Sequence, residues 1–287
     1  MGMWVILALG SAFMLSLSDV LAKRLLRSID PWAAAWIKLA GAAVVTLPLW
    51  LSAPKPAPWP FALYLLAAVP LELLALYGYH AAIGRSHLSV SVPMLAFTPV
   101  FLLPVGFVLV GDRPSAAGAA GVALVTAGAY WLHLAPGQGW SAPLRNMWRE
   151  PGARSMLGVA LVYAFTSSLG KKLVGLSSAA FFGGFYPLVL AVTLSPLALT
   201  KARRRSLRAV DRNTAVALAV AYAAMMVLHF AAVARAPVAY MIAVKRTSLV
   251  FAVVWGRLVF GEPAFGRRLL AAALMAAGVV LLATSPF

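Results

Sequence analysis

Two adjacent cations, Lys245 and Arg246, lie inside an apolar stretch that extends over residues 238–260, long enough for a helix to cross a bilayer. Lys245 is seven residues from the start of this stretch, a depth of about 10 Å. A cation at the middle of a membrane helix costs about 2.5–3.5 kcal/mol, so such residues face the protein interior and usually have partners there. We therefore expect Lys245 and Arg246, with Ser248 beside them, to bind an anion. The structural alternative is an internal ion pair with Glu72 and capping of helix carbonyls.

Two further ionisable residues are predicted inside apolar stretches, Lys38 in WIKLAG and Glu72 in PLELLALYGYH. Lys38 is seven residues into its stretch and is expected to support the substrate site. Glu72 is either a structural counter-ion to Lys38 or a carboxyl group that carries a proton. Asp19, close to Lys23, is expected near a helix end.

Residue sets for other kinds of chemistry are missing from the sequence. It contains no cysteine, which excludes disulfides and thiolate metal sites. A membrane enzyme would need a nucleophile, a metal set or paired carboxylates, and Glu72 is a single deep carboxylate. His80 and His229, near helix ends, are interpreted as hydrogen-bonding residues and not as proton relays. We therefore expect no enzyme activity, no metal and no cofactor.

The composition is that of an integral membrane protein. Hydrophobic residues make up 63% of the 287 residues and charged residues 11%, and the mean hydropathy is +0.90; no ordinary soluble domain approaches these values. The formal net charge of +17 suggests a nucleic-acid partner at first sight. The basic residues lie between apolar stretches, however, where Lys and Arg orient a membrane protein and contact anionic lipid headgroups. We therefore expect contact with lipid headgroups and not with nucleic acid.

Apolar stretches separated by proline, glycine and charged residues predict an all-α membrane protein with ten transmembrane helices. The helices are expected at residues 3–21, 32–51, 61–80, 88–110, 115–134, 155–173, 179–200, 213–232, 237–260 and 267–284. The polar segment 135–154 combines tryptophan and arginine side chains and is predicted to lie at the bilayer interface. The fourth helix contains Pro93, Pro99 and Pro104, which either break it or only kink it.

The two halves of the chain match each other when one is shifted by 150 positions. Without a gap, the shift superimposes Arg85 on Arg235, Val100-Phe101 on Val250-Phe251, and Gly111-Asp112 on Gly261-Glu262. Each half contains five predicted helices, and because five is odd the second half must enter the membrane in the opposite orientation. We predict two inverted five-helix repeats, at residues 1–134 and 155–287, joined by the interfacial linker 135–154.

These features resemble the EamA-type drug/metabolite transporter superfamily. The resemblance lies in a helix that contains Thr98-Pro99-Val100 and ends at Gly111-Asp112, and in its repeat, a helix that ends at Gly261-Glu262 before a helix of small residues. It covers nearly the whole chain. It implies a ten-helix secondary transporter with a substrate cavity between the two halves, working by alternating access.

Lys245-Arg246 further resembles a pair in the ninth helix of the triose-phosphate translocator branch, where the pair is understood to bind substrate phosphate. This resemblance implies that Tyr222, one helix earlier, also lines the site. The branch usually carries another lysine in its fourth helix, and the repeat-related position here is Leu95. The resemblance therefore indicates an organic anion, with a phosphorylated anion as the narrower alternative.

The charge distribution predicts the orientation of the chain. Loops after odd-numbered helices contain 15 basic residues and loops after even-numbered helices contain 5. The positive-inside rule then places the odd-numbered loops in the cytoplasm and both termini outside. The resemblance implies the reverse, because ten-helix members of the family usually have both termini inside. We expect a multi-pass protein of the cell (inner) membrane with its termini outside.

The leading hypothesis from the sequence is a secondary transporter for a small organic anion. The residues expected to bind the substrate are Lys245, Arg246, Tyr222, Lys38 and Ser248. Glu72 is expected to act as a coupling site or a counter-ion. The alternatives are an exporter of amino acids or amphipathic metabolites, in which the Lys-Arg pair is structural, and a flippase for a lipid phosphate or lipid-linked carrier. Coupling to a proton or a counter-substrate, and a homodimeric state, are left open by the sequence.

Overall fold

The protein is described by a computed structural model that covers residues 2–85, 92–132, 134, 139–141, 144–145, 150–200, 207, 210–260 and 266–287. Every regular element within these ranges is a helix. In chain order the helices are α1 (Met3–Leu25), α2 (Pro31–Val45), α3 (Leu47–Ser52), α4 (Pro58–Arg85), η1 (Val92–Phe97), α6 (Thr98–Val110), α7 (Ala116–Leu132), α9 (Pro151–Leu176), α10 (Ala179–Ala198), α12 (Arg212–Val233), α13 (Val238–Lys245), α14 (Ser248–Phe260) and α15 (Gly266–Thr284). The predicted all-α class is therefore confirmed.

Local sequence signals set several helix ends. The Asp30 carboxylate accepts a hydrogen bond from the Trp32 backbone N–H at 2.9 Å and begins α2. Ser178 begins α10 in the same way, because its hydroxyl accepts from the Phe181 N–H at 3.0 Å. Acceptor side chains at this position satisfy backbone donors that have no partner within the helix. At the end of α6, Gly111 adopts φ 74°, a left-handed conformation that favours glycine, and so turns the chain at the following residue, Asp112.

Membrane spans are recognised by length and apolar composition. Seven stretches in the described part of the chain are long and apolar enough to cross a membrane, and three shorter apolar helices accompany them. Apolar side chains on the outside of the bundle, such as Val44, Leu66 and Val108, are more than 70% exposed, as expected for side chains that face lipid. The multi-pass architecture is therefore confirmed, whereas the number of ten spans stays a prediction.

Three of the predicted helices are interrupted. The helix expected at 32–51 divides at Thr46, whose hydroxyl donates to the Ala42 carbonyl at 2.8 Å; such back-bonding bends helices. The stretch expected at 88–110 changes from the 3₁₀ helix η1 to the α-helix α6 at Thr98, directly before Pro99. The stretch expected at 237–260 divides into α13 and α14. Within the described residues the proline-rich stretch therefore stays helical through Thr98, where its geometry changes from 3₁₀ to α.

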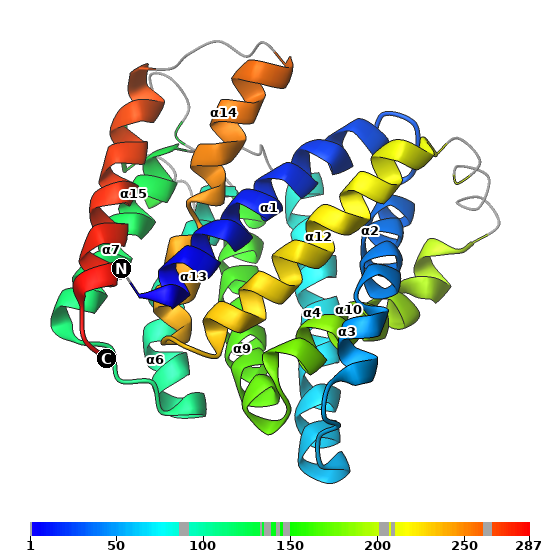
Figure 1. Cartoon of the computed structure of the whole chain (residues 1–287). Coiled ribbons are helices and arrows are strands. Elements are labelled where there is room, and N and C mark those ends of the chain that lie inside the picture. Colours follow the sequence, from blue (N-terminus) through cyan, green and yellow to red (C-terminus); the bar gives the residue numbers. More distant parts are fainter. Residues whose placement is uncertain are drawn as a thin grey trace.

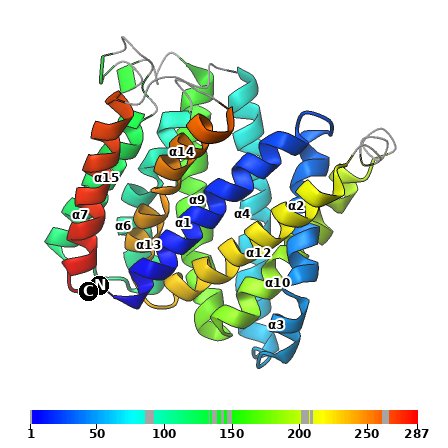
Figure 2. The same ribbon diagram turned by 45° about the horizontal axis from the view of Figure 1, so that its top comes forward.

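The helix contacts follow a two-fold pattern between the halves of the chain. α1 packs along α12 and α4 packs along α9, while α2 contacts α10 and α7 contacts α15 (Figures 1 and 2). By their order in the chain, α1, α2, α4 and α7 of the first half correspond to α9, α10, α12 and α15 of the second. Exchanging each helix for its counterpart leaves this set of contacts unchanged. Such a pattern is expected of inverted repeats. The α7–α15 contact is close, because a methyl group at Gly128 would lie 2.8 Å from the Ala271 carbonyl oxygen.

Both termini lie at the same end of the bundle (Figure 1). We call this end the termini side; residues 53–57, 111–115, 177–178 and 234–237 also lie there. The other end, which we call the opposite side, carries residues 26–30 and 210–211. Half of the predicted linker 135–154, most of the basic segment 201–212 and all of Gly261-Glu262 lie outside the described residues.

Candidate functional site

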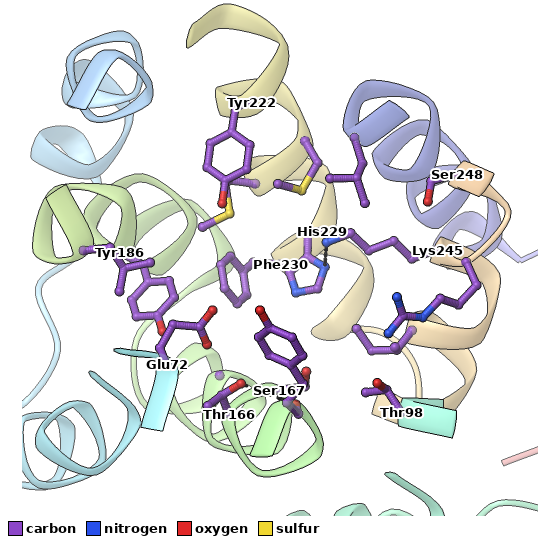
Figure 3. Close-up of a pocket in the computed structure, with 18 residues that line it drawn as sticks. Glu72, Thr98, Thr166, Ser167, Tyr186, Tyr222, His229, Phe230, Lys245 and Ser248 are labelled. Atoms are coloured by element: carbon purple, nitrogen blue, oxygen red, sulfur yellow. Dashed lines mark hydrogen bonds between the residues drawn. The ribbon is translucent and has the colours of Figure 1, made fainter. Parts of the chain in front are cut away.

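A cavity of about 220 Å³ between the two repeats brings together five of the six residues predicted for the site (Figure 3). These five are Glu72 of α4, Tyr222 of α12, Lys245 at the end of α13, Arg246 in the following turn, and Ser248 at the start of α14. We call this space the central cavity. The sixth predicted residue, Lys38, lines an adjoining cavity.

Lys245 is held by a histidine and not by a carboxylate. Its Nζ lies 3.1 Å from Nδ1 of His229, which is 9% exposed and lies on α12 (Figure 3). An ammonium group has only donors, so Nδ1 must be the acceptor in this bond when Lys245 is charged. The ring of His229 is itself fixed edge-on against Phe230, with 4.7 Å between ring centroids. The interpretation of His229 as a hydrogen-bonding residue is confirmed.

Arg246 is the cation of the central cavity that lacks a protein partner. Its Nε is buried and has no hydrogen-bond partner, and within the described residues its guanidinium group forms no ion pair. A charged group in this condition is costly unless a ligand or water completes it. A guanidinium group also presents donors in the planar arrangement that carboxylates and phosphates accept.

Glu72 faces the same cavity from the opposite wall (Figure 3). Thr166 lines the cavity on the same wall, and its hydroxyl group donates to the Tyr163 carbonyl at 3.4 Å. Among the described residues, Glu72 makes no ion pair with Lys38, Lys245 or Arg246. The cavity wall thus carries two cations and one carboxylate that do not neutralise one another by direct contact.

Lys38 is linked to the central cavity through Tyr222. Its Nζ lies 4.6 Å from the centroid of the Tyr222 ring, within the range of a cation–π interaction. Lys38, Glu72, Tyr163 and Tyr222 line the adjoining cavity of about 160 Å³, and all of these except Lys38 also line the central cavity. The Tyr222 ring therefore lies between Lys38 and the central cavity, and it contacts Lys38 on one side and the cavity on the other.

A third cavity, of about 390 Å³, continues from Lys38 toward the opposite side. It is lined by Asp19, Lys23, Lys38 and Tyr163 together with residues at the α1–α2 turn, Leu26 and Pro31. Asp19 was expected only as a residue near a helix end, and the structure instead places it on the wall of this cavity. Three adjoining spaces thus extend from the α1–α2 turn to Lys245.

Two of the three interrupted helices meet the central cavity at repeat-related positions. Thr98 is the first residue of α6, Ser248 is the first residue of α14, and both line the cavity. A shift of 150 positions superimposes one on the other. Corresponding points of the two repeats, where the helix geometry changes at Thr98 and where α14 begins at Ser248, therefore both lie at the cavity wall.

A sequence model of the EamA-like transporter family matches residues 2–134 and 151–284, which is most of the chain. The chain belongs to the EamA-like transporter family. This confirms the superfamily resemblance and identifies the chain as a membrane transporter. Members of this family are transporters and not enzymes. The narrower resemblance to the triose-phosphate translocator branch stays a prediction.

Structural comparison shows that the fold occurs in a solved structure. A solved structure, described only as the crystal structure of a protein, is 14% identical in sequence to this chain. The two superimpose with a TM-score of 0.73 over 98% of each chain. At this identity the likeness shows the fold alone. No curated protein matches the sequence. The comparisons therefore leave the substrate of this EamA-like protein to be inferred from its site.

Sequence reasoning missed several residues of the EamA-like cavity. Thr98 could have been found, because it is the repeat partner of Ser248. Tyr163 and Tyr186 also line the central cavity, and a tyrosine inside an apolar stretch signals a hydroxyl group that needs a polar partner. The bond between His229 and Lys245 joins residues 16 positions apart on different helices, and no local pattern predicts it.

Proposed function

We propose that this EamA-like protein is a secondary transporter for a small organic anion, which binds at Lys245 and Arg246 during alternating access between the two sides of the membrane. The observation that carries the proposal is Arg246, whose buried Nε has no hydrogen-bond partner and which forms no ion pair among the described residues, beside Lys245, which is held by a histidine ring. Glu72 offsets only one of these two charges, so an anionic substrate would complete the cavity.

Each residue has a distinct role in the proposal. Arg246 donates two parallel hydrogen bonds to the anionic group of the substrate, and Lys245 contributes a point charge directed by His229. The hydroxyl groups of Tyr222 and Ser248 donate to the remaining oxygens of the substrate. Lys38 attracts the anion along the cavities that adjoin the central one. A volume of about 220 Å³ lies below the range of drug-sized pockets, which favours a small metabolite.

The anionic group is a carboxylate or a phosphate, since both accept the paired donors of a guanidinium group. Glu72 serves as the site that couples transport to a proton, or as a counter-ion when the cavity is empty. We also propose that the protein resides in the cell (inner) membrane with both termini outside, on the strength of the excess of basic residues in the odd-numbered loops.

One observation favours the second candidate, an exporter of amino acids or amphipathic metabolites. Glu72 and Lys245 face each other across the central cavity (Figure 3), and a zwitterion could pair its ammonium group with one and its carboxylate with the other. Tyr186 and Phe230 would then pack against its apolar part. This candidate differs from the leading one in requiring Glu72 for binding.

The test compares Arg246→Gln with Arg154→Gln, a substitution at an exposed arginine of α9. Purified protein is screened by thermal shift with sugar phosphates, carboxylates, amino acids and lipid phosphates, and ligands found in this way are used in proteoliposome uptake. Since a hydrogen bond to a charged group contributes about 1.5–3 kcal/mol, Arg246→Gln should weaken binding of the anion about 10- to 100-fold. Arg154→Gln should bind like the unaltered protein. A folded Arg246→Gln protein with unchanged affinity would contradict the proposal.

A further inference from the structure

The termini side of the bundle carries an ion pair that is joined to two backbone groups. The Asp112 carboxylate, just after α6, places Oδ1 2.5 Å from the Nζ of Lys171, near the end of α9. Its Oδ2 accepts a hydrogen bond from the Val238 backbone N–H at 2.7 Å. Lys171 Nζ also donates to the Ala236 carbonyl at 2.9 Å. One carboxylate and one ammonium group thus hold together the α6–α7 turn, α9 and the α12–α13 turn.

A second contact lies beside the ion pair. The hydroxyl group of Tyr240 on α13 accepts a hydrogen bond from the Ser115 backbone N–H at 3.0 Å. Tyr240 is fully buried, and the space for its hydroxyl exists because position 118 on α7 is glycine. This contact fastens α13 to the start of α7.

Three of these four contacts cross between the repeats, whereas the bond from Lys171 to the Ala236 carbonyl lies within the second repeat. Asp112 and Ser115 belong to the first half of the chain, whereas Lys171, Val238 and Tyr240 belong to the second. In an alternating-access transporter the two repeats move against each other around the substrate site. Contacts that join the repeats on one side must therefore break before that side can open.

The ion pair also lies between the central cavity and the medium on the termini side. Gly170 lines the central cavity, whereas the next residue, Lys171, lines a recess of about 400 Å³ on the termini side. Asp112, Arg113 and Arg235 line the same recess. The ion pair is partly reached by solvent, because the side chains of Lys171 and Asp112 are 22% and 10% exposed.

The opposite side has a different arrangement. There the cavities lined by Lys38 and Asp19 adjoin the central cavity and extend to the α1–α2 turn. The adjoining cavities therefore lead toward the opposite side, whereas the termini side carries the ion pair between the repeats.

We propose that Asp112 and Lys171 form a gate that closes the central cavity toward the termini side. The inference rests on the proposed transport function and adds to it the residues that hold one of the two access states. An ion pair at a partly hydrated position suits this role, because water can replace its partners when it opens. Loss of Lys171 leaves Asp112 with its bond to the Val238 N–H but removes the links to α9 and to the Ala236 carbonyl.

The test measures opening directly and requires no substrate. The chain contains no cysteine, so no native cysteine has to be replaced first. Arg113→Cys and Arg235→Cys then place one spin label on each side of the recess. The distance between the labels is measured by double electron–electron resonance in four proteins: the labelled parent, Lys171→Gln, Lys171→Arg and Lys172→Gln. Lys172 is the matched control, because it is the next residue of α9 and its Nζ lies instead 5.9 Å from the centroid of the Tyr64 ring.

In the distance distribution of Lys171→Gln we expect a population at longer distance, and its ratio to the population at the parent distance should rise about tenfold. This is the change that the loss of a hydrogen-bonded charge pair predicts. Lys171→Arg and Lys172→Gln should give the parent distribution. A folded Lys171→Gln protein with the parent distribution would overturn the gate, even if its thermal stability were reduced, because the ion pair would then only support the fold. An equal change in Lys172→Gln would also overturn it. If Lys171→Gln opens the recess while Arg246→Gln binds anions normally, the gate stands and the proposed substrate class is wrong.

Discussion

The Nζ of Lys245 lies 3.1 Å from Nδ1 of His229, so the lysine that faces the central cavity is fixed by a neutral ring on the neighbouring helix. A carboxylate in the place of His229 would neutralise the ammonium group and weaken its attraction for a substrate anion. The histidine orients the ammonium group without removing its charge. His229 is therefore a positioning residue that acts on the substrate through Lys245.

The first prediction concerns His229. We expect His229→Leu to weaken anion binding about tenfold, because the Lys245 ammonium group loses a hydrogen bond of about 1.5 kcal/mol and its fixed direction. His229→Asn should retain most of the affinity, since its amide oxygen can accept in place of Nδ1. Isothermal titration with the ligand found by screening measures both affinities. If the two variants lost the same affinity for the anion, with thermal unfolding unchanged, the hydrogen-bond acceptor at position 229 would not determine anion binding.

The fold could be predicted from the sequence because its signals are long and redundant. Apolar stretches of about twenty residues are rare outside membrane-spanning helices. The repeat is shown by a constant shift of 150 positions, which superimposes Arg85 on Arg235 and Asp112 on Glu262. An odd number of helices in each half then requires inversion. For the fourth helix the sequence left a break and a kink open, because proline residues permit either, and the division of the stretch 237–260 before Ser248 was not predicted.

The site was predicted only in part, for a physical reason. Lys245, Arg246 and Glu72 stand out because charge in hydrocarbon is costly wherever it occurs. Asp112 and Lys171 lack this signal, since each lies near a predicted helix end, where charged residues are common. Their ion pair joins positions 59 residues apart and depends on how the two repeats pack. Sequence spacing identifies the buried charges but not the pairs that form between helices.

The second prediction tests Glu72 as the coupling residue. Among the described residues Glu72 makes no ion pair, so glutamine can replace it without leaving a buried cation unpaired. We expect Glu72→Gln to bind the anion normally but to lose the acceleration of proteoliposome uptake by an imposed proton gradient. Uptake of the anion is measured with and without the gradient. Normal acceleration in Glu72→Gln would leave Glu72 as a counter-ion, and loss of binding would favour the zwitterion candidate.

The third prediction uses a glycine at the termini side. A methyl group at Gly118 would overlap the hydroxyl group of Tyr240, whereas one at Gly158 of α9 would meet nothing within 4 Å. We expect Gly118→Ala to destabilise the protein by about 1–3 kcal/mol, the usual cost of overpacking. Gly158→Ala should be neutral or stabilise the protein by about 0.5–1 kcal/mol, since alanine is the better helix former. Thermal unfolding in detergent compares the two, and equal stability would contradict the tight contact at Tyr240.

The fourth prediction concerns membrane orientation. Because both termini lie at the same end of the bundle (Figure 1), tags at the N-terminus and the C-terminus must report the same side of the membrane. The excess of basic residues in the odd-numbered loops favours the outside for both. In spheroplasts with an intact inner membrane we expect an epitope tag at either terminus to be labelled by an impermeant antibody, and a tag inserted between Arg27 and Ser28 to be labelled only after permeabilisation of that membrane. Labelling of the inserted tag alone would reverse the orientation and would place the Asp112–Lys171 gate on the cytoplasmic side. Labelling of one terminus without the other would contradict the arrangement of the helices itself.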